Sequence, residues 1–447
     1  MPVLRFFIPP LLLLLFAAGE AVAQEVPTAA ERTFNLQQAV DYAYGNSNAV
    51  RNARVDILDA AENVREQLAG GLPQINGTLD FQHFLKVPVL PLPEAFAMGD
   101  PNAPTSIAFQ LKNNFTAGIA ASSQVFNGSF FVALKAARES ETFYNLQLEE
   151  TQRQVRNQVT QSYFPVLLLS TNLTILDRNI DNLERLLVET RAQYEAGFIE
   201  QLDVDRLVLS LRNLRNNRAN VLVQRDNALR NLKFALNYPE EETLNVSDDL
   251  NELELEIEQT ALAGEIPYGA RSEVRLLDQT LKLQDLNLEL QRAAYLPSVS
   301  AVLSGQYQYQ GDNLSDGFWA PTVVAGLTAN IPIYEFGGRS ARVQRAKLAK
   351  EKIVNQRDDV VRGIELEVRN ARSTFVTAKE VLDQSRENQD LARRIYETTQ
   401  IKYREGVGSS IEVVQAEQQL YEAQANYLTA LYDTLVAKEN LYLALGQ

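Results

Sequence analysis

The sequence contains no cysteine and only one histidine among its 447 residues. Without cysteine there is no disulfide, no thiol nucleophile and no thiol for a lipid anchor. With a single histidine, imidazole-based proton transfer and soft-ligand metal sites are nearly excluded. That histidine, His83, lies in a run of alternating apolar and polar side chains, so we interpret it as a strand residue. We therefore predict neither a cofactor nor a metal site.

Positive charge is also scarce relative to negative charge. Lysine and arginine total 42 against 57 acidic residues, which gives a formal net charge of −15. A surface of that sign repels nucleic acid, so no nucleic-acid partner is expected. The sequence also has no phosphate-binding loop, no paired metal ligands and no nucleophile beside a base. We predict that the chain is not an enzyme and has no catalytic residue.

Long hydrophobic runs are missing outside the N-terminus. There, Arg5 precedes a leucine-rich stretch at 11–15, and small residues follow up to Ala21-Val22-Ala23. This order is typical of a cleavable signal peptide, here residues 1–23. A membrane-spanning helix is the alternative, but the run is shorter than the roughly 20 residues that a bilayer requires, and Pro9-Pro10 interrupts it. The sequence predicts an exported protein that is soluble or meets a membrane through strands.

What the sequence does contain is a duplication. The segment 194–204 aligns without a gap with the segment 403–413, and each has a glycine three residues after its first tyrosine. Farther upstream, the Leu-Pro pair ending at Pro73 matches the one ending at Pro297, in a slightly different register. Each copy therefore predicts a helix, a Leu-Pro break, a strand hairpin, a long helix, a glycine turn and a second long helix.

We predict two repeats joined by a linker. The first repeat spans 24–237, the linker 238–270 and the second repeat 271–447. The strand hairpins and long helices are expected at 74–126, 129–196 and 200–236 in the first copy, and at 298–334, 338–405 and 409–445 in the second.

The predicted long helices carry heptad spacing. Apolar residues step by three and four from Val166 to Tyr194, and again from Val413 to Ala444. This spacing is typical of a coiled-coil seam, and we predict that the long helices of each copy form antiparallel coiled coils. A helix over 129–192 would be roughly 95 Å long at about 1.5 Å per residue, which suits a rod or a tube. Its single proline, Pro165, predicts a kink or an unwound turn.

Between each Leu-Pro break and the next long helix, side chains alternate in polarity. In the second copy Val299 and Leu303 share one face, whereas Ser300 and Gln306 share the other. Such alternation is typical of strands, either in a sheet that covers a soluble core or in a membrane β-barrel. The barrel is favoured because the chain is predicted to be exported and because the flanking helices leave no sequence that could cover one face of a soluble sheet.

A barrel would have to be shared between chains. Two hairpins supply four strands, whereas the smallest transmembrane barrels have about eight, because every edge must be paired in lipid. Several copies must then combine, and cyclic symmetry is the natural arrangement. Four strands per chain are compatible with an assembled barrel of eight, twelve or more strands, and the sequence does not select one of these.

Several short motifs of this sequence together resemble those of a known protein family. They are the opening Leu36 to Ala43, the two Leu-Pro breaks, the helix entry at 333–338, and the two glycine tips followed by 202–204 and 411–413. In their order and duplication, the whole mature chain resembles the TolC-like outer-membrane efflux proteins. The first copy departs from that pattern at 125–128, where the usual proline and paired glycines are reduced.

The resemblance implies a mainly α-helical fold with a membrane β-barrel portion. It implies a homotrimer whose twelve-strand barrel, four strands from each chain, contacts outer-membrane lipid and continues into the periplasm as a helical tunnel. Substrates of a tripartite efflux or type I secretion system would leave passively through it, energised by an inner-membrane transporter through a periplasmic adaptor. The linker 238–270 would belong to a belt around the tunnel, or is simply solvated.

The alternative function is a periplasmic coiled-coil scaffold or adhesin stalk without a pore, in which the alternating segments form a soluble sheet. Membrane fractionation discriminates between the two, because a barrel requires detergent for extraction. The cargo is not readable from the sequence.

The resemblance places the periplasmic closure of the channel at the two helix turns. Gly197, Gly406 and Gly408 permit the positive φ of a tight helix end, and we expect these tips to contact the adaptor.

Asp203 and Glu412 follow the two turns at equivalent positions. In a ring of chains their carboxylates would form an acidic constriction that favours cations. Tyr403 matches a family tyrosine that helps to hold the closed state, whereas Gln415 and Gly408 stand where the family has an acidic and a basic gate residue. The other interpretation is that both acids merely stabilise helix N-termini.

Overall fold

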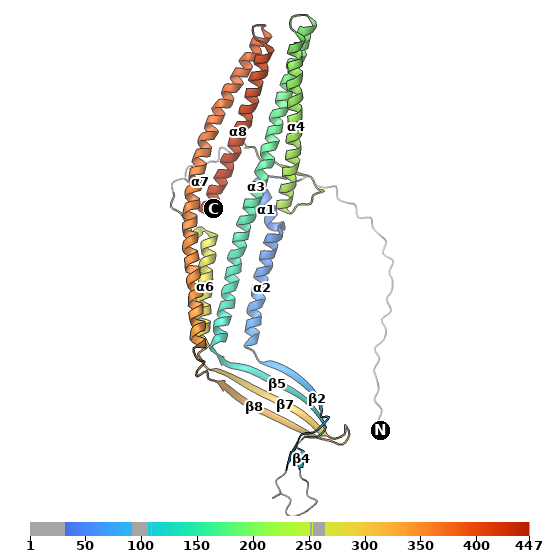
Figure 1. The fold of residues 1–447 in the computed structure, drawn as a ribbon, viewed down its shortest axis with the longest axis vertical. Helices are drawn as coiled ribbons and strands as arrows, with labels where there is room; N and C mark the ends of the chain where they lie inside the picture. Colours follow the sequence, from blue (N-terminus) through green and yellow to red (C-terminus); the bar gives the residue numbers. More distant parts are fainter. Residues whose placement is uncertain (1–31, 92–105, 109, 251–252, 254–263, 447) are drawn as a thin grey trace, which may run out of the picture.

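A computed structural model describes most of the chain, and the molecule is elongated, with long helices standing on a slanted β-sheet (Figure 1). The described residues are 32–91, 106–108, 110–250, 253 and 264–446. The predicted signal peptide at 1–23 and part of the predicted linker 238–270 lie outside them. The division into a signal peptide, two repeats and a linker stays a prediction.

The principal sheet has four antiparallel strands, two from each predicted hairpin. They are β2 (Gln74–His83), β5 (Asn113–Asn127), β7 (Ser298–Gly311) and β8 (Phe318–Asn330), in the spatial order β2-β5-β7-β8. The strands β2 and β8 therefore form two edges without a partner in this sheet. A small pair not predicted from the sequence, β3 (Val89–Pro91) with β4 (Ser106–Ala108), lies in the connection between β2 and β5.

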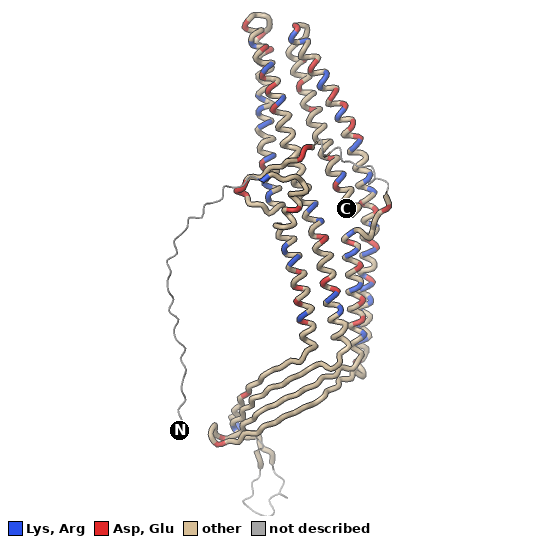
Figure 2. Tube along the Cα trace, turned by 180° about the vertical axis from the view of Figure 1, so that it is seen from behind, with Lys and Arg blue, Asp and Glu red and all other residues tan. Residues whose placement is uncertain are grey.

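The register of the four strands sorts the sheet into two faces. Leu79 lies opposite Ala117, which lies opposite Tyr307, whereas one residue along, Thr78 and Gly118 share a row with Gln306. Polar and apolar rows alternate in this way along much of the sheet. Figure 2 shows charged residues distributed along the helices but largely absent from the strands.

Within the described strands β2, β5, β7 and β8, Asp80 is the only charged residue, and it shares its row with Thr116 and Gln308 on the polar face. The single charge of these strands thus lies on the polar face, and the apolar face has none.

The helices form two antiparallel hairpins with a shorter helix beside each. The pair α3 and α4 and the pair α7 and α8 are the hairpins, α2 packs along α3, and α6 packs along both α7 and α3 (Figure 1). The bounds are α1 (Leu36–Asn46), α2 (Asn48–Gly70), α3 (Gly128–Glu195), α4 (Gln201–Leu236), α6 (Ser272–Ala293), α7 (Gly338–Arg404) and α8 (Ser410–Leu445). The predicted fold class is confirmed.

Among the residues that the structure describes, no helix is both long and apolar enough to cross a membrane.

Burial is continuous along the helices. The largest cluster lies where α1, α3, α4 and α8 meet, around residues such as Tyr163, Leu232 and Leu431. The helix α3 runs through Pro165 without a break, so the unwound turn predicted there is wrong. Both neighbours, Phe164 and Val166, are buried in this cluster, and their packing offsets the one backbone hydrogen bond that proline removes.

The described part of the segment 238–270 is packed against the helices. The strand β6 (Leu244–Val246) pairs in parallel with β1 (Arg32–Phe34). Asp248 accepts hydrogen bonds of 2.8 Å from the backbone N–H of Leu36 and from the hydroxyl of Tyr163. This part of the segment is therefore not a free solvated linker.

Candidate functional site

The two helix tips have the backbone geometry expected of a glycine turn. Gly197 has a φ of 82° and Gly406 a φ of 74°, both in the left-handed region. The N–H of Phe198 donates to the carbonyl of Gln193 at 3.0 Å, and the N–H of Val407 donates to the carbonyl of Lys402 at the same distance. Each bond spans five residues, as in the Schellman motif, so both hairpins end in the same kind of turn.

Gly408 has a different reason to be glycine. It is not among the residues with positive φ, so the prediction that it supplies a left-handed turn is wrong. A Cβ built there would lie 3.1 Å from the backbone nitrogen of Tyr403 and 3.3 Å from Lys402. Glycine is needed here because the chain that enters α8 passes close to the last turn of α7, where a side chain would disturb the packing.

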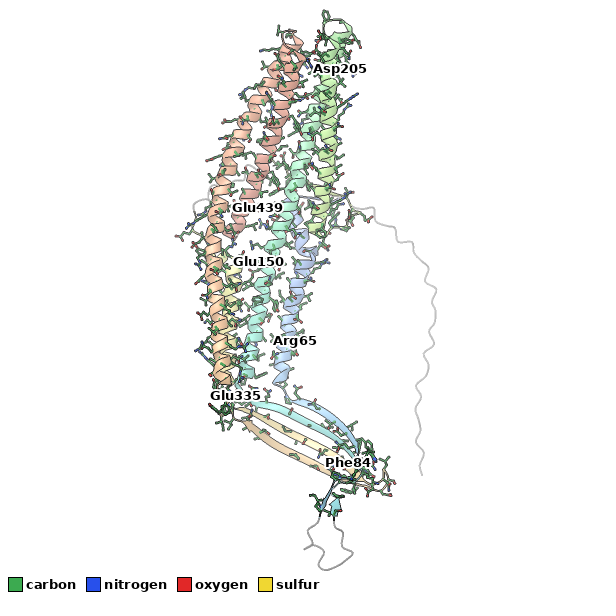
Figure 3. All side chains as sticks on the ribbon, in the orientation of Figure 1. Arg65, Phe84, Glu150, Asp205, Glu335 and Glu439 are labelled. Carbon is green, nitrogen blue, oxygen red and sulfur yellow. The ribbon has the colours of Figure 1, made fainter. Side chains whose placement is uncertain are left out.

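Asp203 connects the two hairpins. It lies in the first turn of α4, and its Oδ1 accepts a hydrogen bond from the hydroxyl of Ser410, the first residue of α8. The guanidinium of Arg206 lies 3.6 Å from the same oxygen and 3.4 Å from the Ser410 hydroxyl. This end of α4 is marked by Asp205 in Figure 3. The carboxylate is thus half-buried in a contact between hairpins within one subunit.

Glu412 occupies the equivalent position of the second repeat but has a different partner. It closes a capping box with Ser409, whose N–H donates to Oε2 at 3.4 Å, and it is exposed. This is the helix N-terminal role that the sequence left open as the alternative to a constriction. The two acids are therefore not equivalent in the single subunit.

Tyr403 forms a second contact between the hairpins. Its hydroxyl donates to Oγ1 of Thr190 on α3 at 3.4 Å, and its side chain is buried. Burial raises the pKa of its phenol, so the group is a neutral donor at physiological pH. Beside it, Arg404 donates to Glu189 at 2.8 Å. Tyr403 and Asp203 thus link different pairs of helices at the same end of the molecule.

Further polar contacts between the hairpins were missed by the sequence analysis. Ser210 on α4 bonds Glu417 on α8, Asn217 bonds Tyr421, and Asn179 on α3 bonds Gln424. The sequence does contain a pattern that could have indicated these contacts. Asp203, Ser210 and Asn217 are spaced by seven residues, which places them on one face of α4.

A cavity of 1230 Å³ is lined by residues of both hairpins. Charges of both signs line it, including Arg178, Arg393 and Asp390, which suits water rather than an apolar ligand. In the described ranges no group of three or more His, Asp or Glu residues is placed to hold a metal ion.

Comparison with known proteins gives consistent matches over nearly the whole chain. The family model described as outer membrane efflux protein matches residues 39–238 and 271–447. The Escherichia coli cation efflux system protein CusC is 25% identical over 443 residues, which cover 95% of this chain and 90% of CusC. The crystal structure of CusC superposes with a TM-score of 0.70 at 18% identity, covering 94% of this chain and 95% of that one. The Campylobacter jejuni CmeC outer membrane channel gives 0.67 at 18% identity, covering 98% and 94%.

Proposed function

Because the chain belongs to the outer membrane efflux protein family, we propose that its two hairpins close the periplasmic end of a channel that three copies build together. The predicted efflux function and outer-membrane location are confirmed by the family match. This family consists of channels and not of enzymes, and the alternative of a stalk without a pore gains no support from CusC or CmeC.

The proposal for assembly depends on one observation, the two-faced sheet with two open edges. In a bilayer each backbone N–H and C=O of an edge must be paired. β8 of one subunit would pair with β2 of the next, and a ring of copies leaves no edge. Three chains of four strands give the twelve strands that the family resemblance implies. The polar face would line the pore, and the apolar face would contact outer-membrane lipid.

The partners would meet the chain at its helical end. A passive duct does no work itself, so an inner-membrane transporter would supply energy, and a periplasmic adaptor would join the two. Gly197 and Gly406 are exposed at the tips and Gly408 is half-buried, which leaves main chain accessible to an adaptor. An adaptor that separates the two tips would break the contacts between hairpins.

Closure would reside in the contacts that join the hairpins. Asp203 and Tyr403 hold α4 to α8 and α3 to α7 within a subunit. Around a three-fold axis the carboxylates of Asp203 and Glu412 would also surround the constriction and favour cations. CusC is described as a cation efflux system protein, so cations are a cargo class to test for this chain.

The test is the double substitution Asp203→Ala with Glu412→Ala. Removing the acceptor of Ser410 and the acidic ring should raise single-channel conductance severalfold and reduce preference for cations over anions. Both are measured in planar bilayers across a salt gradient. The matched control is Asp205→Ala, since this exposed acid at the same end bonds only along its own helix to Gln201 among the contacts described. Unchanged conductance and selectivity in the double variant would reject the constriction.

A further inference from the structure

The helices α4 and α8 are joined by polar contacts at successive levels. Asp203 bonds Ser410 at the tip, Ser210 bonds Glu417 one heptad farther along, and Asn217 bonds Tyr421 beyond that. The first and third are made by partly exposed groups, whereas the Ser210–Glu417 bond of 2.8 Å is buried. A buried carboxyl group at the middle level is the unusual member of the series.

Glu417 is 6% exposed and lies on α8 between Val413 and Leu420, both members of the apolar cluster that holds the hairpins together. Its Oε2 accepts the hydroxyl hydrogen of Ser210, but its Oε1 has no hydrogen-bond partner. Neighbouring members of the cluster from the two helices are Leu207, Leu211, Val413 and Leu420. An ionised carboxylate in such surroundings lacks solvation, whereas a protonated one needs much less.

Two of the helices packed against α8 place polar groups near Glu417. α4 contributes the Ser210 hydroxyl, and α7 contributes the phenol of Tyr396, whose pKa is raised to about 12 by burial and by the charge of Glu417. Arg185 of α3 and Arg404 of α7 act on Tyr396 in the opposite direction. For Glu417 itself, burial raises the pKa to about 7, and the hydrogen bond from Ser210 partly opposes that rise.

We propose that Glu417 is a proton-binding latch: in its protonated form it keeps α4 packed against α8, and its ionisation loosens the contact between the hairpins. The proposal rests on the proposed function in one respect: separation of the hairpins opens a channel only if the hairpins close one. The buried Oε1 without a hydrogen-bond partner, at a contact between the two hairpins, carries it.

The direction of the pH effect follows from the two states. When the hairpins separate, Glu417 meets water and its pKa returns toward the ordinary 4.5, so the packed state binds the proton more tightly. The packed state has its full stability below about pH 4.5, loses it as the pH rises from there, and the loss levels off above about pH 7. Between about pH 5 and 8, the equilibrium should move toward separated hairpins by on the order of a hundredfold.

The experiment measures hairpin separation directly. Because the chain has no cysteine, Leu209→Cys on α4 and Gln418→Cys on α8, both exposed, accept spin labels without background. Distances are recorded by pulsed electron resonance on full-length trimers diluted with unlabelled subunits, from pH 5 to pH 8. The populations of short and long distances are compared in the otherwise unchanged chain, in Glu417→Gln and in Ser210→Ala. Glu422→Gln, an exposed glutamate on the same helix, is the control.

The unchanged chain and Glu422→Gln should shift to longer distances as the pH rises. Glu417→Gln, which has the same shape but no ionisable proton, should keep the short distance at every pH. Ser210→Ala removes the donor that favours the carboxylate, so its midpoint should move to higher pH, a change that simple loss of packing would not produce. This variant also keeps the test decisive should Glu417→Gln fail to fold.

An identical pH response in Glu417→Gln and in the unchanged chain would overturn the latch, and so would constant distances in the unchanged chain. The result is separate from that of the conductance test. If the Asp203 and Glu412 substitutions leave conductance unchanged while the label distances follow pH, the constriction fails and the latch stands.

Discussion

Val323→Arg is expected to abolish recovery of the assembled protein from the outer membrane. Val323 lies near the middle of β8 and is 77% exposed in the single chain. It shares a row with Gly305 and Ile119 on the apolar face, the face that we propose contacts lipid in the assembled barrel. An arginine at the bilayer midplane costs about 2–4 kcal/mol, and a trimer would incur this cost three times. Detergent extraction followed by size-exclusion with light scattering measures the trimer.

The neighbouring residue gives a matched control. Thr322 faces the other way, in a row with Gln306 and Gly118. If the polar face lines the pore as proposed, Thr322→Arg places the same charge, one residue away, in water. The trimer should form, and its preference for cations should fall. Equal loss of trimer in both variants would contradict the assignment of the two faces.

The sequence predicted the features that depend on local periodicity. Alternation at residues such as Val299 and Ser300 identified strands, heptad spacing identified the long helices, and the duplicated glycines Gly197 and Gly406 identified the turns. These patterns repeat every two, three to four, or seven residues, so neighbours along the chain suffice to read them. Together with the order of the motifs, they were enough for the fold class and the family, which are confirmed.

The partners of the candidate site residues could not be read in the same way. Asp203 bonds Ser410, which is 207 positions away, and the choice of partner depends on how two hairpins pack. Glu412 has the same sequence context in the second repeat, yet it closes a local capping box. Duplication in the sequence predicted equivalence, whereas packing makes the two copies different. Their proposed role in a constriction stays a prediction.

Glu417 was missed for a related reason. A glutamate on an amphipathic helix is normally on its solvated face, and nothing in a single heptad distinguishes a buried one. Two neighbouring facts would have raised the question. Ala416 and Leu420 of the same seam flank it, and Ser210 stands one heptad after Asp203 on the partner helix. Only the three-dimensional packing shows that these residues meet.

The junction below the hairpins depends on one buried arginine. Arg271 is 3% exposed and donates to the carbonyls of Leu443 and Ala444, at 3.0 and 2.6 Å, at the end of α8. The same guanidinium pairs with Glu367 of α7 at 2.8 Å and with Glu273 of α6 at 3.0 Å. One side chain thus ties three helices together beside Glu150, which Figure 3 labels on α3.

Arg271→Met should destabilise the subunit by about 2–4 kcal/mol, because it removes the donor to the Ala444 carbonyl, one of two donors to the Leu443 carbonyl and the partner of Glu367. Glu273 keeps its ion pair with Arg153 at 2.6 Å. Arg362→Met is the control: Arg362 is exposed on the same α7 that carries Glu367, and it pairs with Asp359 only one turn away. Loss of an exposed pair costs at most about 1 kcal/mol. Denaturation midpoints of the detergent-solubilised trimer compare the two. A midpoint for Arg271→Met as high as that of Arg362→Met would mean that α6, α7 and α8 hold together by apolar packing alone, through residues such as Val274 and Leu441.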